Sequence, residues 1–419
     1  MLHDARGWYH GTVELTTDLL DVLSAVPSTP ERAEAEITLR TSLARGILAT
    51  RGYTEEAEEA FMAALALSEE AGAKPRRFPM LRSLATFYLY RGEFDKTAAI
   101  GRELLELAEQ QDDQGLQVEG HLLFGSSVAF RGDVSTGMEH LDRAIALFDP
   151  QRHQPGPLRL GPSSGVSSYT TSALLLWLLG SPAQAAGRAA KALELAGQLN
   201  HPFTLAYARF HVGLLDLWRR DYELVHARAN RTLEVAEEHD YPLWRALAFA
   251  LQGAAITGVG RPEEGLARID RGIALYQGLK TPPVFWPLLL SVKAGAFVQS
   301  DRPESGLDLI DQAIAITGDR NLQYPEFALV KGDLLLALGD PGGAESTFRR
   351  AFDVAEGLGL SMSQLRAATR LTRLWRAAMK RPDGTDELRD LYETFTEGLE
   401  TRDLVEARAV LDEVDARVV

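Results

Sequence analysis

The sequence of 419 residues contains no cysteine. A disulfide framework, a thiolate nucleophile and a cysteine-ligated zinc site are therefore excluded. Long apolar runs are also missing, because the longest, Ala173 to Leu179, is far too short to span a bilayer. The first residues, MLHDARGWYHG, have neither the basic flank nor the apolar run of a signal peptide. We therefore expect a cytoplasmic protein that has no membrane partner.

The sequence contains fewer basic than acidic residues. Against 59 Asp and Glu residues there are only 44 Lys and Arg residues, which gives a net charge of −15. Nucleic-acid binding draws most of its affinity from Lys and Arg on phosphates, and basic clusters such as Arg349-Arg350 are too short to reverse the balance. We therefore expect no nucleic-acid partner.

The motifs that mark metal and nucleotide sites are missing as well. No Gly-Lys dipeptide occurs, so the phosphate-binding loop of nucleotide-binding ATPases is absent from this sequence. The nine histidines never occur four residues apart, the spacing that places two imidazoles on one helix face for a metal. We expect no metal and no cofactor, and interpret the following histidines as packing or groove residues: His121, His140, His201 and His211.

One match to a catalytic motif is misleading. The segment 161–165, GPSSG, satisfies the G-x-S-x-G pattern of a hydrolase nucleophile elbow. That elbow needs a strand before the serine and a helix after it, on an α/β sheet. No part of the sequence alternates between apolar and polar residues for long enough to build such a sheet. We therefore predict that the protein is not an enzyme.

What the sequence does contain is a repeat of about 40 residues. Two apolar-periodic segments flank a hinge, as in FPMLRSLATFYLYRGEFDKTAAIGRELLEL at 78–107, and successive hinges lie 38 to 48 residues apart. The predicted hinge residues are Gly52, Gly92, Gly132, Gly180, Arg220, Gly260, Asp301 and Gly339.

Small residues recur at fixed distances from each hinge. The position seven residues before it is small in seven of the eight repeats, and the position five residues after it never exceeds valine. At twelve residues after the hinge only Leu104 is bulky. Two antiparallel helices approach closely only where their side chains are short, so this pattern predicts a packed helical hairpin in each repeat.

These offsets resemble the tetratricopeptide pattern, whose helix pair normally takes 34 residues. The longer repeat resembles the C-terminal domain of bacterial signalling ATPases, including those that also carry an adenylate or guanylate cyclase domain. The resemblance covers nearly the whole chain, and it suggests an excised domain or a truncated paralogue of a longer protein. It is carried by PSTPERAEAEITL (27–39), NHPFTLAYARF (200–210), KGDLLLALGD (331–340), QLRAATRLTRLW (364–375) and FTEGLETRDLVEARAVLDEV (395–414).

The expected fold is all-α, a right-handed superhelical solenoid of antiparallel helix pairs with about nine repeats and capping helices. Residues 1–30 are expected to form a lead-in and capping helix, and residues 31–148 repeats 1 to 3. The Pro- and Gly-rich residues 149–165 then form an insertion loop, either a tolerated surface insertion or a lid or partner contact. Residues 166–400 are expected to hold repeats 4 to 9, and residues 401–419 a C-terminal capping helix.

The resemblance also implies a binding groove. In tetratricopeptide arrays the first helix of each pair lines the concave side, at 13, 10, 6, 3 and 2 residues before the hinge. An aromatic concavity of this kind suits an amphipathic peptide, a partner helix or a small ligand. Alternatively, the longer helices close the superhelix and the aromatic side chains only fill it. The predicted groove residues are Arg82, Tyr90, Glu119, Phe130, Trp177, Tyr207, Phe210 and Trp218.

The favoured function is a non-catalytic interaction and sensor module. Its groove would bind a protein segment or a small effector and so regulate a signalling ATPase or nucleotide cyclase. A self-standing peptide or small-ligand receptor is the alternative, although residues 1–26 are too short for the effector module that such receptors usually carry. A third possibility is an oligomerisation scaffold, which gel filtration would distinguish from the other two.

Overall fold

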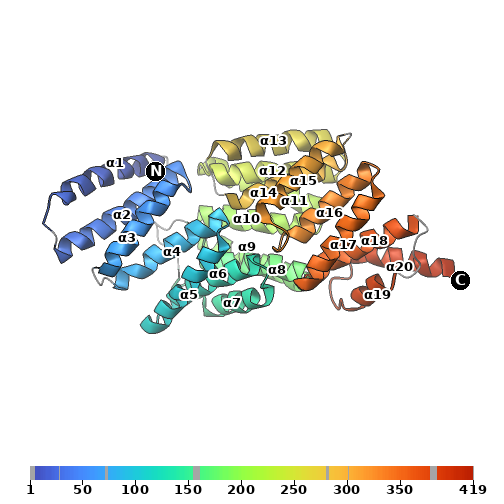
Figure 1. Ribbon diagram of the computed structural model, residues 1–419, viewed down its shortest axis with the longest axis horizontal. Helices are drawn as coiled ribbons and strands as arrows, with labels where there is room; N and C mark the ends of the chain where they lie inside the picture. Colours follow the sequence, from blue (N-terminus) through green and yellow to red (C-terminus); the bar gives the residue numbers. More distant parts are fainter. Residues whose placement is uncertain are drawn as a thin grey trace.

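The protein is described here by a computed structural model, which covers residues 5–27, 29–70, 74–153, 161–279, 283–300, 302–377 and 385–418. Over these residues it forms twenty α-helices and one short 3-10 helix, with no strand. Consecutive helices lie side by side in pairs along the chain, from the blue N-terminal end to the red C-terminal end (Figure 1). The predicted all-α solenoid is confirmed.

Nine helices stand first in their pairs, and three of them place a proline at the first position, where its missing N–H group costs no intrahelical hydrogen bond. The seventh pair begins with the 3-10 helix η1 (Pro283–Phe285), which leads directly into its first α-helix, where a proline stands second. The first helices are α2 (Pro30–Arg51), α4 (Lys74–Arg91), α6 (Gln114–Phe130), α8 (Ser164–Leu178), α10 (Pro202–Trp218), α12 (Pro242–Gly258), α14 (Trp286–Phe297), α16 (Tyr324–Ala337) and α18 (Ser361–Ala377).

Each first helix is followed by a second helix that packs against it. The two remaining helices are α1 (Ala5–Ser24) before the first pair and α20 (Arg402–Val418) after the last. The second helices are α3 (Glu55–Glu70), α5 (Phe94–Gln111), α7 (Val134–Leu147), α9 (Pro182–Leu199), α11 (Tyr222–Glu238), α13 (Pro262–Gly278), α15 (Pro303–Thr317), α17 (Pro341–Gly357) and α19 (Thr385–Glu393). None of the described helices is long and apolar enough to cross a membrane.

The turns of seven pairs have the predicted hinge residue at positive φ, in the left-handed region. All six predicted glycine hinges have positive φ, and so does Arg220, at 59°. The turn at Gly180 is typical, since Gly180 donates to the carbonyl of Trp177 and Ser181 to that of Leu176. These bonds satisfy the last carbonyl groups of a helix, and glycine adopts the left-handed conformation without a steric penalty. The hinge at Asp301 lies outside the described residues.

The small residues at fixed offsets lie where two helices touch. A Cβ atom on Gly253 of α12 would come within 2.5 Å of the backbone oxygen of Gly265 on α13. The alanines five and twelve residues after the hinges are fully buried, as Ala185 and Ala192 illustrate. The close helix contacts that the sequence predicted are therefore present.

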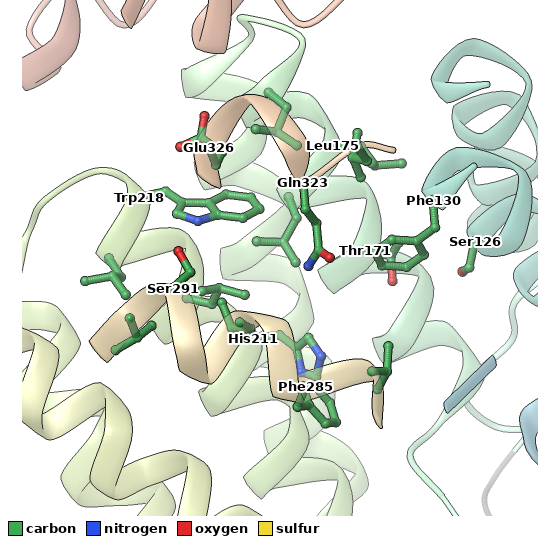
Figure 2. A pocket seen from close by; sticks show the side chains of 18 of the residues that line it. Ser126, Phe130, Thr171, Leu175, His211, Trp218, Phe285, Ser291, Gln323 and Glu326 are labelled. Carbon is green, nitrogen blue, oxygen red and sulfur yellow. The ribbon is translucent and has the colours of Figure 1, made fainter. Parts of the chain in front are cut away.

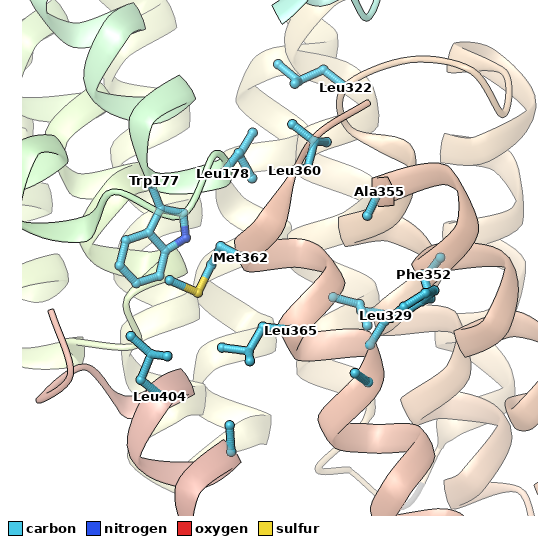
Figure 3. Packing of buried hydrophobic residues seen from close by; sticks show 14 of the residues in the cluster. Trp177, Leu178, Leu322, Leu329, Phe352, Ala355, Leu360, Met362, Leu365 and Leu404 are labelled. Carbon is cyan, nitrogen blue, oxygen red and sulfur yellow. The ribbon is translucent and has the colours of Figure 1, made fainter. Parts of the chain in front are cut away.

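The solenoid also closes on itself. A single core runs from Ala129 on α6 to Leu411 on α20, so it joins the third to fifth pairs to the eighth and ninth. Within it Trp177 of α8 lies beside Met362 of α18 and near Leu404 of α20 (Figure 3). Polar contacts follow the same seam, because Glu397 accepts the backbone N–H groups of Ala183 and Gln184 at the start of α9. The turns of the middle repeats are thus covered by the C-terminal helices.

Candidate functional site

A cavity of about 380 Å³ lies at the centre of the closed superhelix. Its wall comes from the first helices of the second to ninth pairs, that is from the even-numbered helices α4 to α18. The 3-10 helix η1, the turns that precede α11 and α16, and Gly161 and Pro162 of the insertion complete it. First helices face inward because the second helix of each pair covers their outer side. Many of the lining side chains are apolar or aromatic, among them Leu175, Trp218 and Phe285 (Figure 2).

Two carboxylates carry negative charge into the cavity wall, and each is already paired. Glu119 of α6 accepts from Arg82 of α4 at 2.9 Å and also from the hydroxyl of Ser164 on α8. Glu326 of α16 is bound by Arg366 of α18 and accepts from Ser363 at 2.7 Å. Each cluster combines an arginine, a glutamate and a serine from neighbouring first helices. The two carboxylates therefore add little uncompensated charge to the cavity.

The cluster around Glu326 extends through further ion pairs to α20. Arg366 lies 3.3 Å from the carboxylate of Asp403, which Arg220 also binds at 2.8 Å. Burial works against the charged form of Arg366, but the carboxylates of Glu326 and Asp403 outweigh it and raise the pKa of its guanidinium. Arg220 and Arg366 both line the cavity, so this ion-pair chain connects the cavity wall to α20.

Most of the predicted groove residues come together at this cavity. The six that line it are Arg82, Tyr90, Glu119, Phe130, Tyr207 and Trp218. They come from α4, α6 and α10, whose residues are adjacent in the wall but widely separated in sequence. That these side chains bind a ligand remains a proposal.

The other two predicted groove residues lie elsewhere. Trp177 has no exposed surface and packs in the core that closes the superhelix. Phe210 is 1% exposed and packs in the core formed by α10, α11 and α12. The prediction that both side chains line the concave groove is wrong. At these two positions the side chain points toward a neighbouring helix and away from the cavity. The alternative, that closure of the superhelix buries aromatic side chains, holds for Trp177, whereas Phe210 is buried by the adjacent helix pairs.

Sequence reasoning missed several cavity residues. His211 of α10 and Thr171 of α8 both stand nine residues before their hinge, whereas the pattern used ten. Phe285 belongs to η1, which is the one 3-10 helix among the described residues. A helical face repeats at steps of three and four residues, so positions 13, 9, 6 and 2 before the hinge form one continuous stripe. That periodicity was the signal that could have identified His211.

Three of the four histidines that we interpret as packing or groove residues lie at two separate places. His211 lies against the ring of Tyr207, and burial lowers the pKa of His211 to about 4. His121 and His140 join α6 to α7 through their Nδ1 atoms, 2.9 Å apart, and burial lowers the pKa of both. Across the described residues, no group of three or more His, Asp or Glu side chains is arranged to hold a metal ion.

The G-x-S-x-G segment starts a helix. Ser163 is the N-cap residue of α8, and its backbone N–H donates to the hydroxyl of Thr204 at 3.1 Å. The described residues contain no strand on which a nucleophile elbow could be built. Of the insertion at 149–165, residues 154–160 lie outside the described part of the chain.

The fold and the cavity define a tetratricopeptide-like helical repeat protein. No family model matches the chain, and no curated protein is similar to it in sequence. Among solved structures, a Rap protein complexed with competence and sporulation factor has a TM-score of 0.52 at 12% identity, over 81% of this chain and 98% of that one.

Two further structures are similar at lower scores. NprR in complex with its cognate peptide NprX has a TM-score of 0.49 at 14% identity, over 82% of this chain and 98% of that one. A signal transduction ATPase with numerous domains and a tetratricopeptide repeat sensor, from Pyrococcus horikoshii, has a TM-score of 0.45 at 12% identity, over 91% of this chain and 55% of that one. These likenesses concern the fold alone, and only the Rap score is high enough to support it.

Proposed function

We propose that the protein is a non-catalytic sensor module whose central cavity binds a small effector or a short segment of a protein. The observation that carries this proposal is that eight successive first helices contribute side chains to one apolar cavity. Its volume of about 380 Å³ falls within the range of ligand pockets, roughly 300 to 1,000 Å³. A Rap protein of the same fold is complexed with competence and sporulation factor, so this architecture is compatible with a bound ligand.

The proposed output of binding is regulation of a partner, with a signalling ATPase or a nucleotide cyclase as the favoured candidate. A ligand that contacts helices from both halves of the superhelix changes the stability of its closed form, because it binds that form better than an open one. The ion-pair chain from Glu326 to Asp403 places α20 where such a change would reach it. A self-standing receptor uses the same cavity, and differs only in having no separate partner.

The experiment is purification of the tagged chain from its native cell, followed by mass spectrometry of everything that stays bound. The proposal predicts a peptide or small molecule in stoichiometric amount. A co-purifying ATPase or cyclase should change its turnover when that ligand is removed. A chain that carries no ligand and elutes from gel filtration as a stable oligomer would contradict the proposal and favour a scaffold.

A further inference from the structure

His211 supplies an unusual polar atom to the wall of the cavity. It lies on α10, four residues after Tyr207, and its ring stands beside that of Phe285 (Figure 2). The ring centroids of His211 and Tyr207 are 4.0 Å apart, and those of His211 and Phe285 are 6.3 Å apart. The rings of Phe210 and Trp244 lie behind it, at 5.1 and 6.2 Å. The imidazole is thus the polar member of an aromatic cluster.

A hydrogen bond fixes which nitrogen of His211 carries the proton. Its Nδ1 lies 2.8 Å from the backbone carbonyl oxygen of Tyr207. A carbonyl oxygen can only accept, so Nδ1 must donate, and in a neutral imidazole the other nitrogen, Nε2, then has a free lone pair. Burial lowers the pKa of His211 to about 4, so the ring is neutral near pH 7. Nε2 is consequently a hydrogen-bond acceptor.

That acceptor is not satisfied within the protein. In the part of the chain that the structure describes, no donor forms a hydrogen bond with Nε2 of His211. The indole N–H of neighbouring Trp244 does not reach it either, because that nitrogen is itself buried without a hydrogen-bond partner. Nε2 is not among the buried side-chain atoms that lack a partner, so it is accessible from the cavity. A guest that covers it without offering a donor leaves it unpaired, which is costly. An acceptor in an aromatic wall therefore favours a ligand that brings its own donor.

We propose that Nε2 of His211 accepts a hydrogen bond from the N–H or O–H group of an aromatic ring bound in the central cavity, such as an indole or a phenol. This inference rests on the proposed function and assigns its ligand a chemical class. The rings of Tyr90, Tyr207 and Phe285 offer faces and edges to an aromatic guest, in the offset and edge-on geometries that such rings prefer. The acceptor selects among guests of equal shape, because one without a donor leaves Nε2 unpaired.

The test compares two probes of nearly the same shape, indole and benzofuran, in which a ring oxygen replaces the N–H group. Both are titrated calorimetrically into the full chain at neutral pH. The wild type should bind indole about tenfold more tightly than benzofuran. The preference should disappear in His211→Phe and persist in the matched control His226→Phe, whose histidine is exposed on α11. Gly295→Trp, which fills the cavity, should abolish binding of both probes.

Three outcomes would overturn the inference: equal affinity of the wild type for the two probes, no binding of either probe, or a preference that survives in His211→Phe. The wild-type comparison needs no substitution, so it is decisive even if His211→Phe does not fold. The inference also fails separately from the proposed function. A native ligand retained by a chain that shows no preference for indole contradicts the role of His211 alone. A clear preference in a chain that retains no native ligand contradicts the sensor function alone.

Discussion

Arg220 donates a hydrogen bond to the carboxylate of Asp403 at 2.8 Å, across 183 residues of sequence. Arg220 is also the hinge of the fifth pair, where its φ of 59° is left-handed and most other hinges are glycine. A left-handed conformation costs a residue with a side chain about 1 kcal/mol. The side chain offsets this cost because it also binds Glu406 at 2.7 Å and so fastens α20 to the middle of the solenoid.

Replacing Arg220 should therefore loosen the closed superhelix. In Arg220→Met the buried carboxylate of Asp403 loses one of its two cations, and we expect a loss of about 3 kcal/mol in the free energy of unfolding. Hydrogen exchange should show reduced protection concentrated in α20 and α18. The control is Arg231→Met, whose partner Glu234 is exposed, and which should change stability by less than about 0.5 kcal/mol. Equal effects of the two substitutions would contradict the closure role of Arg220.

The two tryptophans that the sequence placed in one groove should behave differently. Trp177→Ala empties a site in the fully buried closing core and should cost about 3 to 5 kcal/mol in the free energy of unfolding. Trp218 borders the cavity and keeps some exposed surface, so Trp218→Ala should cost clearly less and weaken ligand retention instead. Chemical denaturation monitored by circular dichroism separates the two. A larger loss of stability in Trp218→Ala would reverse the assignment.

The role of the small residues at the helix contacts can be tested by Gly→Ala substitutions, each of which adds a single methyl group. Gly253→Ala places a Cβ atom within 2.5 Å of the backbone of α13, so we expect a destabilisation of about 1 to 3 kcal/mol. Gly187 of α9 is exposed and has nothing within 4 Å of an added Cβ atom, so Gly187→Ala should stabilise the protein by about 0.5 to 1 kcal/mol. Melting temperatures that shift in the same direction for both variants would show that close packing is not what selects glycine at position 253.

His211 should make stability depend on pH. Burial lowers its pKa to about 4, whereas a histidine in the unfolded chain titrates near 6.5. Between these values the unfolded chain binds more protons, so the stabilisation is complete above about pH 6.5 and is lost as the pH falls toward 4. Tyr207, which faces the imidazole, stays neutral in this window because burial raises its pKa.

The matching measurement is denaturant unfolding of the wild type and of His211→Phe at several pH values from 7 to 4. The wild type should lose about 3 kcal/mol more than the variant over this range. A smaller slope should remain in the variant, because burial lowers the pKa of His121 to about 4 as well. Parallel curves for the two proteins would mean that His211 is not buried in its neutral form.

The sequence predicted the repeat and its turns well because each depends on local constraints. A left-handed turn favours glycine, and a close helix contact favours small residues, so both appear at fixed offsets. Even Arg220, which is not glycine, was placed correctly by the period. The position of Trp177 could not be obtained in this way. Its burial depends on α18 and α20, which reach it only when the whole superhelix closes.

The cavity itself was predicted only in part, for the same reason. One offset pattern was applied to every repeat, but α8 and α10 direct the residue nine before the hinge into the cavity in place of the residue ten before it. If α10 is rotated by one residue, His211 faces the cavity in place of Phe210, so a polar side chain replaces an apolar one in the wall. Small rotations of this kind arise from the packing of neighbouring pairs, and no single repeat encodes them.

The central claim is that the cavity holds a ligand, and Gly295 allows it to be tested without damage to the fold. Gly295 lines the cavity on α14 and has nothing within 4 Å of an added Cβ atom, so Gly295→Trp adds an indole to open space. Gly187→Trp is the matched control on the exposed face of α9. The measurement is native mass spectrometry of the wild type and both variants, each purified from the native cell. We expect a bound mass on the wild type and on Gly187→Trp, and none on Gly295→Trp. The same bound mass on all three proteins, or on none, would contradict the account.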